Sequence, residues 1–173
     1  NKNINIATAR AGNVIGGGDW SKNRLIPDIV RSLQKKKILT VRNLESTRPW
    51  QHVLEPIFGY IELASNLNFN PKLSGESFNF GPYNAKNYNV RKILSIFKKN
   101  FKHLRFKKHK KIFFKESGLL NLNCKKAFKS FKWKSRLNFS ETIKHTIYWY
   151  KNYKKIGIKN ITLQQIKEYE KMR

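Results

Sequence analysis

The sequence predicts an α/β fold, because short strand-like segments alternate with helix-like segments over residues 1–90. Two patterns carry this prediction. From Leu25 onward the apolar residues recur at helical spacing, whereas residues 77–80 (SFNF) alternate like a short buried strand. After residue 90 the pattern becomes helical and strongly basic. We therefore expect two parts: residues 1–90, which hold most of the strands, and residues 91–173, which are mostly helical.

The chain opens with residues 4–15 (INIATARAGNVI), which are expected to begin as a strand and to end in a turn. Ile4 and Ile6 are typical of the middle of a buried strand, and the first residue, Asn1, is not a methionine. We therefore expect a fragment of a longer protein. Residues 16–23 (GGGDWSKN) form a glycine-rich loop, which is a weak candidate for anion binding because no helix follows the glycines at once.

A helix is expected from Leu25, with Pro27 in its first turn, where proline is tolerated. The lysines at 35–37 are expected to end this helix, since cations interact favourably with the C-terminal end of the helix dipole. A short strand at 38–42 and an extended segment at 48–53 are expected to follow.

A second helix is expected to open at Glu55 and Pro56. It carries Ile57, Ile61 and Ala64 on one face, at helical spacing. This helix leads to the strand-like segment that supports the α/β assignment.

The basic part of the chain predicts a helix at 90–101 and a strand with an exposed basic face at 104–115. Ser140 is expected to cap the next helix, and Thr162 with Gln165 matches a capping box that would open the final helix. Residues 151–160 are expected to bridge these two helices flexibly.

The net charge of +27 is the largest compositional bias, and it is uneven along the chain. Residues 1–85 hold 11 basic and 6 acidic residues, whereas residues 86–173 hold 26 and 4. Such a charge is typical of proteins that bind nucleic acid or an anionic surface. However, 28 of the 37 basic residues are lysines, and readers of bases rely on arginine. We expect no nucleic-acid partner, although a basic module over 86–136 remains an alternative.

The usual catalytic and metal-binding patterns are absent from the sequence. The chain has one cysteine, Cys124, which excludes an internal disulfide and suits a reducing, cytoplasmic compartment. No apolar run is long enough to span a membrane. The four histidines, at positions 52, 103, 109 and 145, do not have metal-ligand spacing. We therefore assign no catalytic residue and no metal ligand to this chain.

Arg24, Arg42 and Arg48 stand out in the less charged part, each at the edge of an expected element. An arginine fork suits the oxygens of a diphosphate, because two parallel N–H donors match two acceptors. The residues alone leave a second interpretation open, in which these arginines pair with acids at positions 19, 28 and 45 on the surface.

Several segments resemble the CDP-glucose 4,6-dehydratase family, within the wider group of extended short-chain dehydrogenases/reductases. These segments are spread over nearly the whole chain and are residues 10–20 (RAGNVIGGGDW), 24–28 (RLIPD), 48–56 (RPWQHVLEP), 75–82 (GESFNFGP), 122–133 and 162–170 (TLQQIKEYE). The forms GGGDW and RPWQH point to the CDP-glucose enzymes within that group. One departure is Asn123, where the family has an acid.

The resemblance implies the C-terminal part of a Rossmann-type extended short-chain dehydrogenase/reductase, with a small mixed substrate-binding lobe. It implies that Ala11 lies beside the nicotinamide end of the cofactor. It also implies contacts with the nucleotide sugar, in which Arg48 clamps the diphosphate. The implied substrate-binding residues are Asn13, Arg24, Leu25, Val41, Arg42 and Arg48.

The resemblance also implies the chemistry of the family. With NAD tightly bound, hydride leaves C4 of glucose, water is lost across C5–C6 and hydride returns to C6, in deoxysugar synthesis for cell-surface polysaccharide such as the lipopolysaccharide O-antigen. The Tyr-x-x-x-Lys pair and the cofactor turn are expected in a missing N-terminal half, so this chain alone is expected to be inactive. The pairs Tyr88/Lys92 and Tyr150/Lys154 are interpreted as coincidence.

Two further expectations concern partners. The full-length protein is expected to be a homo-oligomer, most simply a dimer, that takes a nucleotide sugar and does not contact a membrane. A sister epimerase or dehydratase that uses another nucleotide remains an alternative, which the base pocket around residues 38–45 would decide.

Overall fold

The computed structural model describes residues 4–83, 88–109 and 122–172. Over these residues the chain forms short strands, six α-helices and one 3-10 turn, η1 (Pro71–Leu73). The strands are β1 (Thr8–Ala11), β2 (Val14–Ile15), β3 (Leu39–Val41), β4 (Thr47–Arg48), β5 (Gln51–His52), β6 (Ser77–Phe80), β7 (Tyr88–Asn89) and β8 (Phe106–Lys108). The helices are α1 (Leu25–Gln34), α2 (Leu54–Phe69), α3 (Val90–Asn100), α4 (Lys125–Phe131), α5 (Phe139–Ile156) and α6 (Ile158–Lys171).

The described strands pair two by two. β1 pairs with β6, β2 with β5 and β3 with β8, all in parallel, while β4 and β7 are antiparallel. Parallel pairs joined through helices are the mark of an α/β protein. The predicted fold class is therefore confirmed at the level of the strands and their connections.

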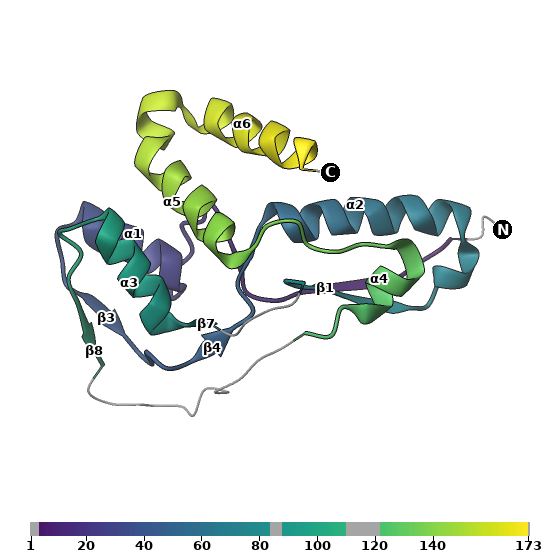
Figure 1. Ribbon diagram of the computed structural model, residues 1–173, viewed down its shortest axis with the longest axis horizontal. Helices are drawn as coiled ribbons and strands as arrows, with labels where there is room; N and C mark the ends of the chain where they lie inside the picture. The colour runs from purple at the N-terminus through teal and green to yellow at the C-terminus, as the bar shows by residue number, and fades with distance from the viewer. Residues whose placement is uncertain (1–3, 84–87, 110–121, 173) are drawn as a thin grey trace.

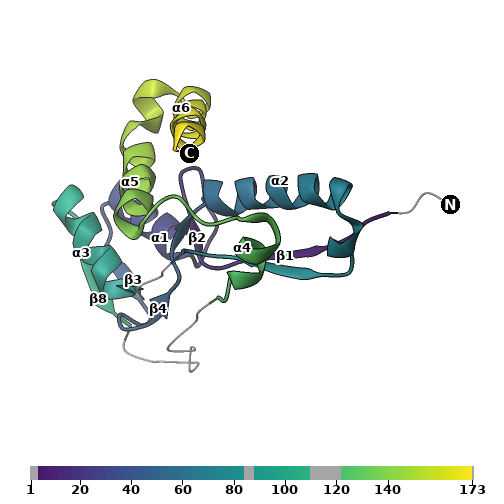
Figure 2. The ribbon, with the colours of Figure 1, turned by 45° about the vertical axis from the view of Figure 1, so that its right-hand side comes forward.

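Two ends can be distinguished in the structure. In Figure 1, α2 and α4 lie beside β1 at one end, while α1 and α3 lie beside β3 and β8 at the other. Helices α5 and α6 lie across the top, and Figure 2 shows α5 descending between the two ends. The largest apolar core lies at the α1/α3 end and includes Ile29, Phe97, Ile143 and Trp149. This core joins residues from both sides of position 90. The division into two parts at that position stays a prediction.

The helices α1 and α3 and the strands β3 and β6 lie where the sequence predicts them. Pro27 lies in the first turn of α1, and Lys35 is its C-cap. Helix α2 also forms as predicted, but its Ile57 and Ile61 are exposed. The face that α2 buries is different: Gly59 contacts the ring of Phe80.

Some expectations about the first residues and the basic segment need correction. Ile4 and Ile6 lie before the first described strand and are 77% and 66% exposed, so they are not in the middle of a buried strand. Strand β1 itself has one described neighbour, β6. The strand predicted at 104–115 is confirmed at β8, and its part at 110–115 lies outside the described residues.

The predicted caps of the last two helices were wrong. Helix α5 is capped by Asn138, which forms a capping box with Glu141, so Ser140 lies inside the helix. Helix α6 begins just after Gly157, and Thr162 is inside it, donating its hydroxyl to the carbonyl of Ile158 over 2.8 Å. Residues 151–160 are helical on both sides of Gly157, whose φ of +89° turns the chain sharply, rather than a flexible bridge.

Candidate functional site

A cavity of about 580 Å³ opens between the carboxyl ends of β1 and β3, the glycine-rich loop and the first turn of α1. In parallel α/β sheets, ligands bind outside the carboxyl ends of the strands. Every residue that the sequence analysis named for the cofactor or the substrate lines this cavity. These residues are Ala11, Asn13, Arg24, Leu25, Val41, Arg42 and Arg48.

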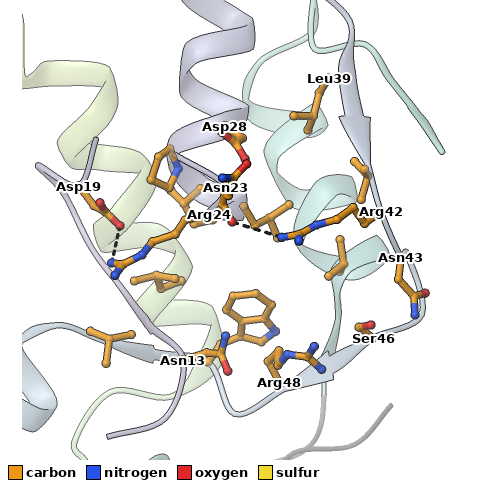
Figure 3. Close-up of a pocket in the computed structure, with 18 of the residues that line it drawn as sticks. Asn13, Asp19, Asn23, Arg24, Asp28, Leu39, Arg42, Asn43, Ser46 and Arg48 are labelled. Carbon is orange, nitrogen blue, oxygen red and sulfur yellow. Dashed lines mark hydrogen bonds and ion pairs between the residues drawn. The ribbon is translucent and has the colours of Figure 1, made fainter. Parts of the chain in front are cut away.

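Three arginines reach the cavity from three different elements, as Figure 3 shows. Arg24 is the N-cap of α1, where an extended backbone directs the chain into the helix. Arg42 follows β3, and its Nη2 donates to the carbonyl of Asn23 over 3.3 Å. Arg48 ends β4, and its Nη1 donates to the carbonyl of Thr47 over 2.8 Å. Three guanidinium groups around one cavity suit an anionic ligand.

Two acids moderate this positive charge. Asp28 lies in the first turn of α1 and pairs with Arg31. Asp19 pairs with Arg24, with 3.2 Å between Oδ2 and Nη1. Partial burial acts to raise the pKa of Asp19, but hydrogen bonds from Ser21 and Arg24 hold it below its ordinary value. Asp19 is therefore ionised at neutral pH, and among the described residues the cavity is lined by three arginines and two aspartates.

Among the described residues, the surface pairing that the sequence left open is seen at Arg24. Arg24 pairs with Asp19, as that interpretation required. Asp28 and Glu45 instead pair with Arg31 and Arg91.

Residues 11–13, at the end of β1, form one wall of the cavity and are held by contacts of their backbone. The backbone carbonyl of Asn13 accepts a hydrogen bond from the backbone amide of Gln51 over 3.1 Å. This bond joins the segment between β1 and β2 to β5. A side chain on Gly12 would lie 2.9 Å from Leu122 and 3.0 Å from Pro49. The backbone after Ala11 is thus packed against neighbouring segments on one side, while Ala11 and Gly12 both line the cavity.

The sequence analysis missed several lining residues. Trp50 forms a buried wall of the cavity, where its indole Nε1 donates to the carbonyl of Tyr88 over 2.8 Å. Its signal was the RPWQH motif, in which only the arginine received a role. Asn23 has a φ of +64°, a left-handed conformation that asparagine tolerates, and the polar loop was its signal. Asn43 and Ser46 also line the cavity without a sequence signal.

Neither tyrosine of the two Tyr-x-x-x-Lys pairs lines the cavity. Tyr88 stacks on Phe139, with ring centroids 3.7 Å apart. Burial, with the charge of Asp19, raises the pKa of Tyr150, which is opposite to what a base requires. Among the described residues, no cluster of three or more His, Cys, Asp or Glu could hold a metal ion. In the same residues, no helix is long and apolar enough to cross a membrane.

No family model matches the chain. One curated relative is 40% identical over 152 residues: CDP-glucose 4,6-dehydratase of Salmonella typhimurium. The resemblance to this enzyme is confirmed. The alignment covers 86% of this chain and 42% of the relative, so the chain spans less than half of the length of that enzyme.

Solved structures extend the comparison to the fold. UDP-glucuronic acid 4-epimerase from Bacillus cereus superimposes with a TM-score of 0.71 at 18% identity, over 86% of this chain and 46% of that one. dTDP-glucose 4,6-dehydratase from Bacillus anthracis gives a TM-score of 0.64 at 17% identity, with the same coverage of both chains. These matches confirm the predicted Rossmann-type α/β fold over the part of it that this chain covers.

Proposed function

We propose that this chain supplies the nucleotide-sugar pocket of an NAD-dependent CDP-glucose 4,6-dehydratase, a lyase. The observation that carries the proposal is the gathering of all seven residues named from the sequence around one cavity. The identity of 40% to an enzyme of that name supports the same substrate.

In this proposal the diphosphate of the substrate lies between Arg24 and Arg48, with Asn13 beside the phosphates. A charge-assisted hydrogen bond to a phosphate contributes about 1.5–3 kcal/mol. The cavity has room for such a ligand between these side chains (Figure 3). The first turn of α1 adds Leu25 to the wall, and a helix N-terminus favours an anion.

The nucleoside would lie on the opposite side, against Val41 and Arg42 at the end of β3. Both residues line the cavity on the β3 side, away from Ala11. Asn43, which follows them, provides an amide that can both donate and accept hydrogen bonds. The base would therefore be read by residues of the 38–45 segment.

The cofactor contact proposed for this chain is small. Ala11 and Gly12 lie at the carboxyl end of β1, where dinucleotides approach parallel sheets. The methyl group of Ala11 and the absence of a side chain at Gly12 would allow the edge of a nicotinamide to approach the backbone. Bound NAD would supply the hydride acceptor and donor of the dehydratase reaction. The residues of this chain bind and orient the sugar nucleotide, and we assign no proton transfer to them.

The proposal extends to the whole protein. We expect a homo-oligomeric, cytoplasmic enzyme that contributes to deoxysugar synthesis for cell-surface polysaccharide such as the lipopolysaccharide O-antigen. A sister enzyme for another nucleotide is the second candidate, since the fold is shared with UDP-glucuronic acid 4-epimerase.

The test is turnover. The protein is expressed with any sequence that flanks this segment in its gene and is given NAD with CDP-glucose, UDP-glucose or dTDP-glucose, while 4-keto product is followed. Product from CDP-glucose alone supports the proposal. Product from another nucleotide moves the protein to a sister enzyme, and no turnover with any of the three, by a protein that carries the Tyr-x-x-x-Lys pair and the cofactor turn, rejects a dehydratase. The 173-residue chain alone is expected to give no product.

A further inference from the structure

The glycine-rich loop beside the cavity is fastened to helix α5, far along the chain. The hydroxyl of Tyr150 donates to the backbone carbonyl of Asp19 over 2.7 Å. The ring of Trp20 meets the Tyr150 ring edge-on, with centroids 5.6 Å apart. Gly17 lies directly against Trp149, since a Cβ there would lie 2.0 Å from the indole ring. The loop thus rests on an aromatic surface of α5.

The same loop is tied to α1 from its other side. The Arg31 guanidinium donates to the carbonyl of Trp20 over 2.7 Å and to that of Ser21 over 2.9 Å. The amide of Ser21 donates to Oδ1 of Asp19 over 2.9 Å. The backbone and the carboxylate of Asp19 are therefore fixed in position by α5, α1 and the loop itself.

The position of the Arg24 guanidinium, in contrast, depends on its ion pair with Asp19. The Arg24 side chain is 65% exposed and the Asp19 side chain 26%, so the acid is the better ordered partner. In the described part of the chain, Arg24 Nη1 donates to Asp19, while Nε and Nη2 donate to no other residue. A guanidinium has five N–H donors in a fork, so a second anion can be bound beside the carboxylate.

We propose that Asp19 is a positioning residue of the pocket: anchored to α5 through Tyr150, it holds the Arg24 guanidinium toward the phosphates of the nucleotide sugar. This inference rests on the proposed function, because it assigns Asp19 a role in binding the same ligand. It makes α5, which does not line the cavity, a determinant of phosphate binding.

An acid at a phosphate site has a second, opposite effect. A fixed carboxylate repels the ligand, and for two phosphate charges about 8 Å away in water, screened by physiological salt, this repulsion corresponds to about a twofold change in affinity. Positioning by an exposed ion pair corresponds to about threefold to fivefold. The proposal therefore predicts that the loss of positioning outweighs the loss of repulsion, and a double-mutant cycle separates the two effects.

The experiment measures the affinity of the intact protein for CDP and for cytidine by calorimetric titration. Asp19→Asn is expected to weaken CDP binding about threefold to fivefold in the wild-type background. In the Arg24→Gln background the same change is expected to strengthen CDP binding about twofold, because repulsion alone is then removed. Cytidine, which has no phosphate, is expected to bind each variant as it binds the wild type.

Two variants serve as matched tests. Tyr150→Phe keeps the ring and removes the hydrogen bond to Asp19, so it is expected to weaken CDP binding about twofold, with cytidine binding retained. Asp28→Asn removes the same charge from the same cavity, but its carboxylate pairs with Arg31 rather than Arg24. It is expected to strengthen CDP binding about twofold, opposite in sign to Asp19→Asn.

The possible outcomes separate the two proposals. If the wild type binds neither CDP nor CDP-glucose, the proposed function is wrong and the role of Asp19 falls with it. If the wild type binds CDP, but Asp19→Asn tightens or does not change that binding, Asp19 only repels and the positioning role is rejected. Equal losses for CDP and cytidine would also reject it, since they would reflect a distorted loop.

Discussion

Two groups contain the same three residue types, an acid with a tyrosine and an arginine, but they lie in very different settings and are bonded differently. Asp19, with Tyr150 and Arg24, lies at the rim of the cavity, and its arginine extends into solvent. Glu55, with Tyr169 and Arg136, is completely buried beneath α6. Comparing the two groups separates what keeps the protein folded from what is available to a ligand.

In the Glu55 group, both oxygens of the buried carboxylate are fully hydrogen-bonded within the protein. Both carboxylate oxygens accept a hydrogen bond from the backbone amide of Arg136, at 2.9 and 3.0 Å. Oε1 also accepts one from the backbone amide of Leu137, at 2.6 Å. The Tyr169 hydroxyl donates to Oε2 over 2.7 Å, and Arg136 Nη1 donates to the Tyr169 carbonyl over 3.1 Å. The donors to Glu55 come from the 136–137 segment and from Tyr169, so this group joins α2, the 136–137 segment and α6.

The comparison shows how burial decides the role of such a group. A buried, fully bonded acid contributes to folding and offers nothing to a ligand, whereas a rim acid contributes little stability and can orient a neighbour. We therefore expect substitutions at Glu55 to affect unfolding and those at Asp19 to affect binding. The predictions below follow from the largest expected effect to the smallest.

The largest effect is expected at Glu55. Glu55→Ala removes all the bonds of the buried carboxylate and leaves the Tyr169 hydroxyl and two amides without an acceptor, so it should lower the free energy of unfolding by about 3–5 kcal/mol. Urea unfolding of the intact protein measures this loss. Asp19→Ala is the matched control and should cost less than about 1 kcal/mol. Similar losses for the two variants would contradict the comparison.

The pH dependence of stability gives a second view of Glu55. Burial raises the pKa of Glu55 above its ordinary value of 4.5, although bonds from Leu137, Tyr169 and Arg136 act to lower it. A raised pKa means that the folded state retains the proton longer than the unfolded state does. Stability relative to Glu55→Gln should therefore fall as the pH rises from 4.5 through the raised pKa. Urea unfolding of both proteins across pH 4–7 checks the sign, and a rise in relative stability would mean that the hydrogen bonds dominate.

Two glycines extend the comparison to packing. A Cβ at Gly59 would lie 2.4 Å from the Phe80 ring, and a Cβ at Gly17 would lie 2.0 Å from Trp149. Each alanine variant should cost about 1–3 kcal/mol by overpacking. Gly59→Ala should leave the CDP affinity unchanged, because Gly59 does not line the cavity and lies outside the glycine-rich loop, whereas Gly17→Ala should also weaken binding by displacing that loop. Thermal unfolding and CDP titration, done on both variants, would contradict this if Gly59→Ala alone impaired binding.

Removing the tyrosine hydroxyl should also lower the free energy of unfolding more in the Glu55 group than in the Asp19 group. Tyr169→Phe leaves Glu55 Oε2 without its hydroxyl donor in the core, and should cost about 1–2 kcal/mol. Tyr150→Phe should cost about 1 kcal/mol or less, because a carbonyl near the rim can bond to water instead. Urea midpoints measure both, and a larger loss in Tyr150→Phe would contradict the assignment of stability to the Glu55 group.

The smallest effect is expected on the outer surface. Lys126 pairs with Glu76, and both side chains are about half exposed. Lys126→Ala should therefore change the free energy of unfolding by about 0.5 kcal/mol or less. A loss above about 1 kcal/mol would show that surface pairs contribute more here than their exposure suggests.

The sequence predicted well those features that depend on local pattern. Helix α1 and strand β6 follow directly from apolar spacing, and α1 contains its proline where the pattern allows one. The cavity residues came instead from the resemblance, which carried Arg24, Arg42 and Arg48 to one site although they lie on three separate elements.

The features that the sequence did not predict depend on contacts between distant residues. The bond from Tyr150 to Asp19 spans 131 positions, and no spacing rule connects them. The cap of α5 was misassigned because both Ser140 and Asn138 are good caps, and Glu141 pairs with Asn138 in the structure. The start of α6 was set by Gly157, which adopts a positive φ without strain.

The most direct test of the account is titration of CDP into the intact protein and into two matched variants. Arg48→Gln removes a guanidinium from the cavity, and Arg136→Gln removes one from the Glu55 group. The account predicts that Arg48→Gln weakens CDP binding about tenfold or more, while Arg136→Gln binds CDP like the wild type and unfolds at lower urea. Unchanged CDP binding by Arg48→Gln would contradict the account, because the cavity would then not be the site of the diphosphate.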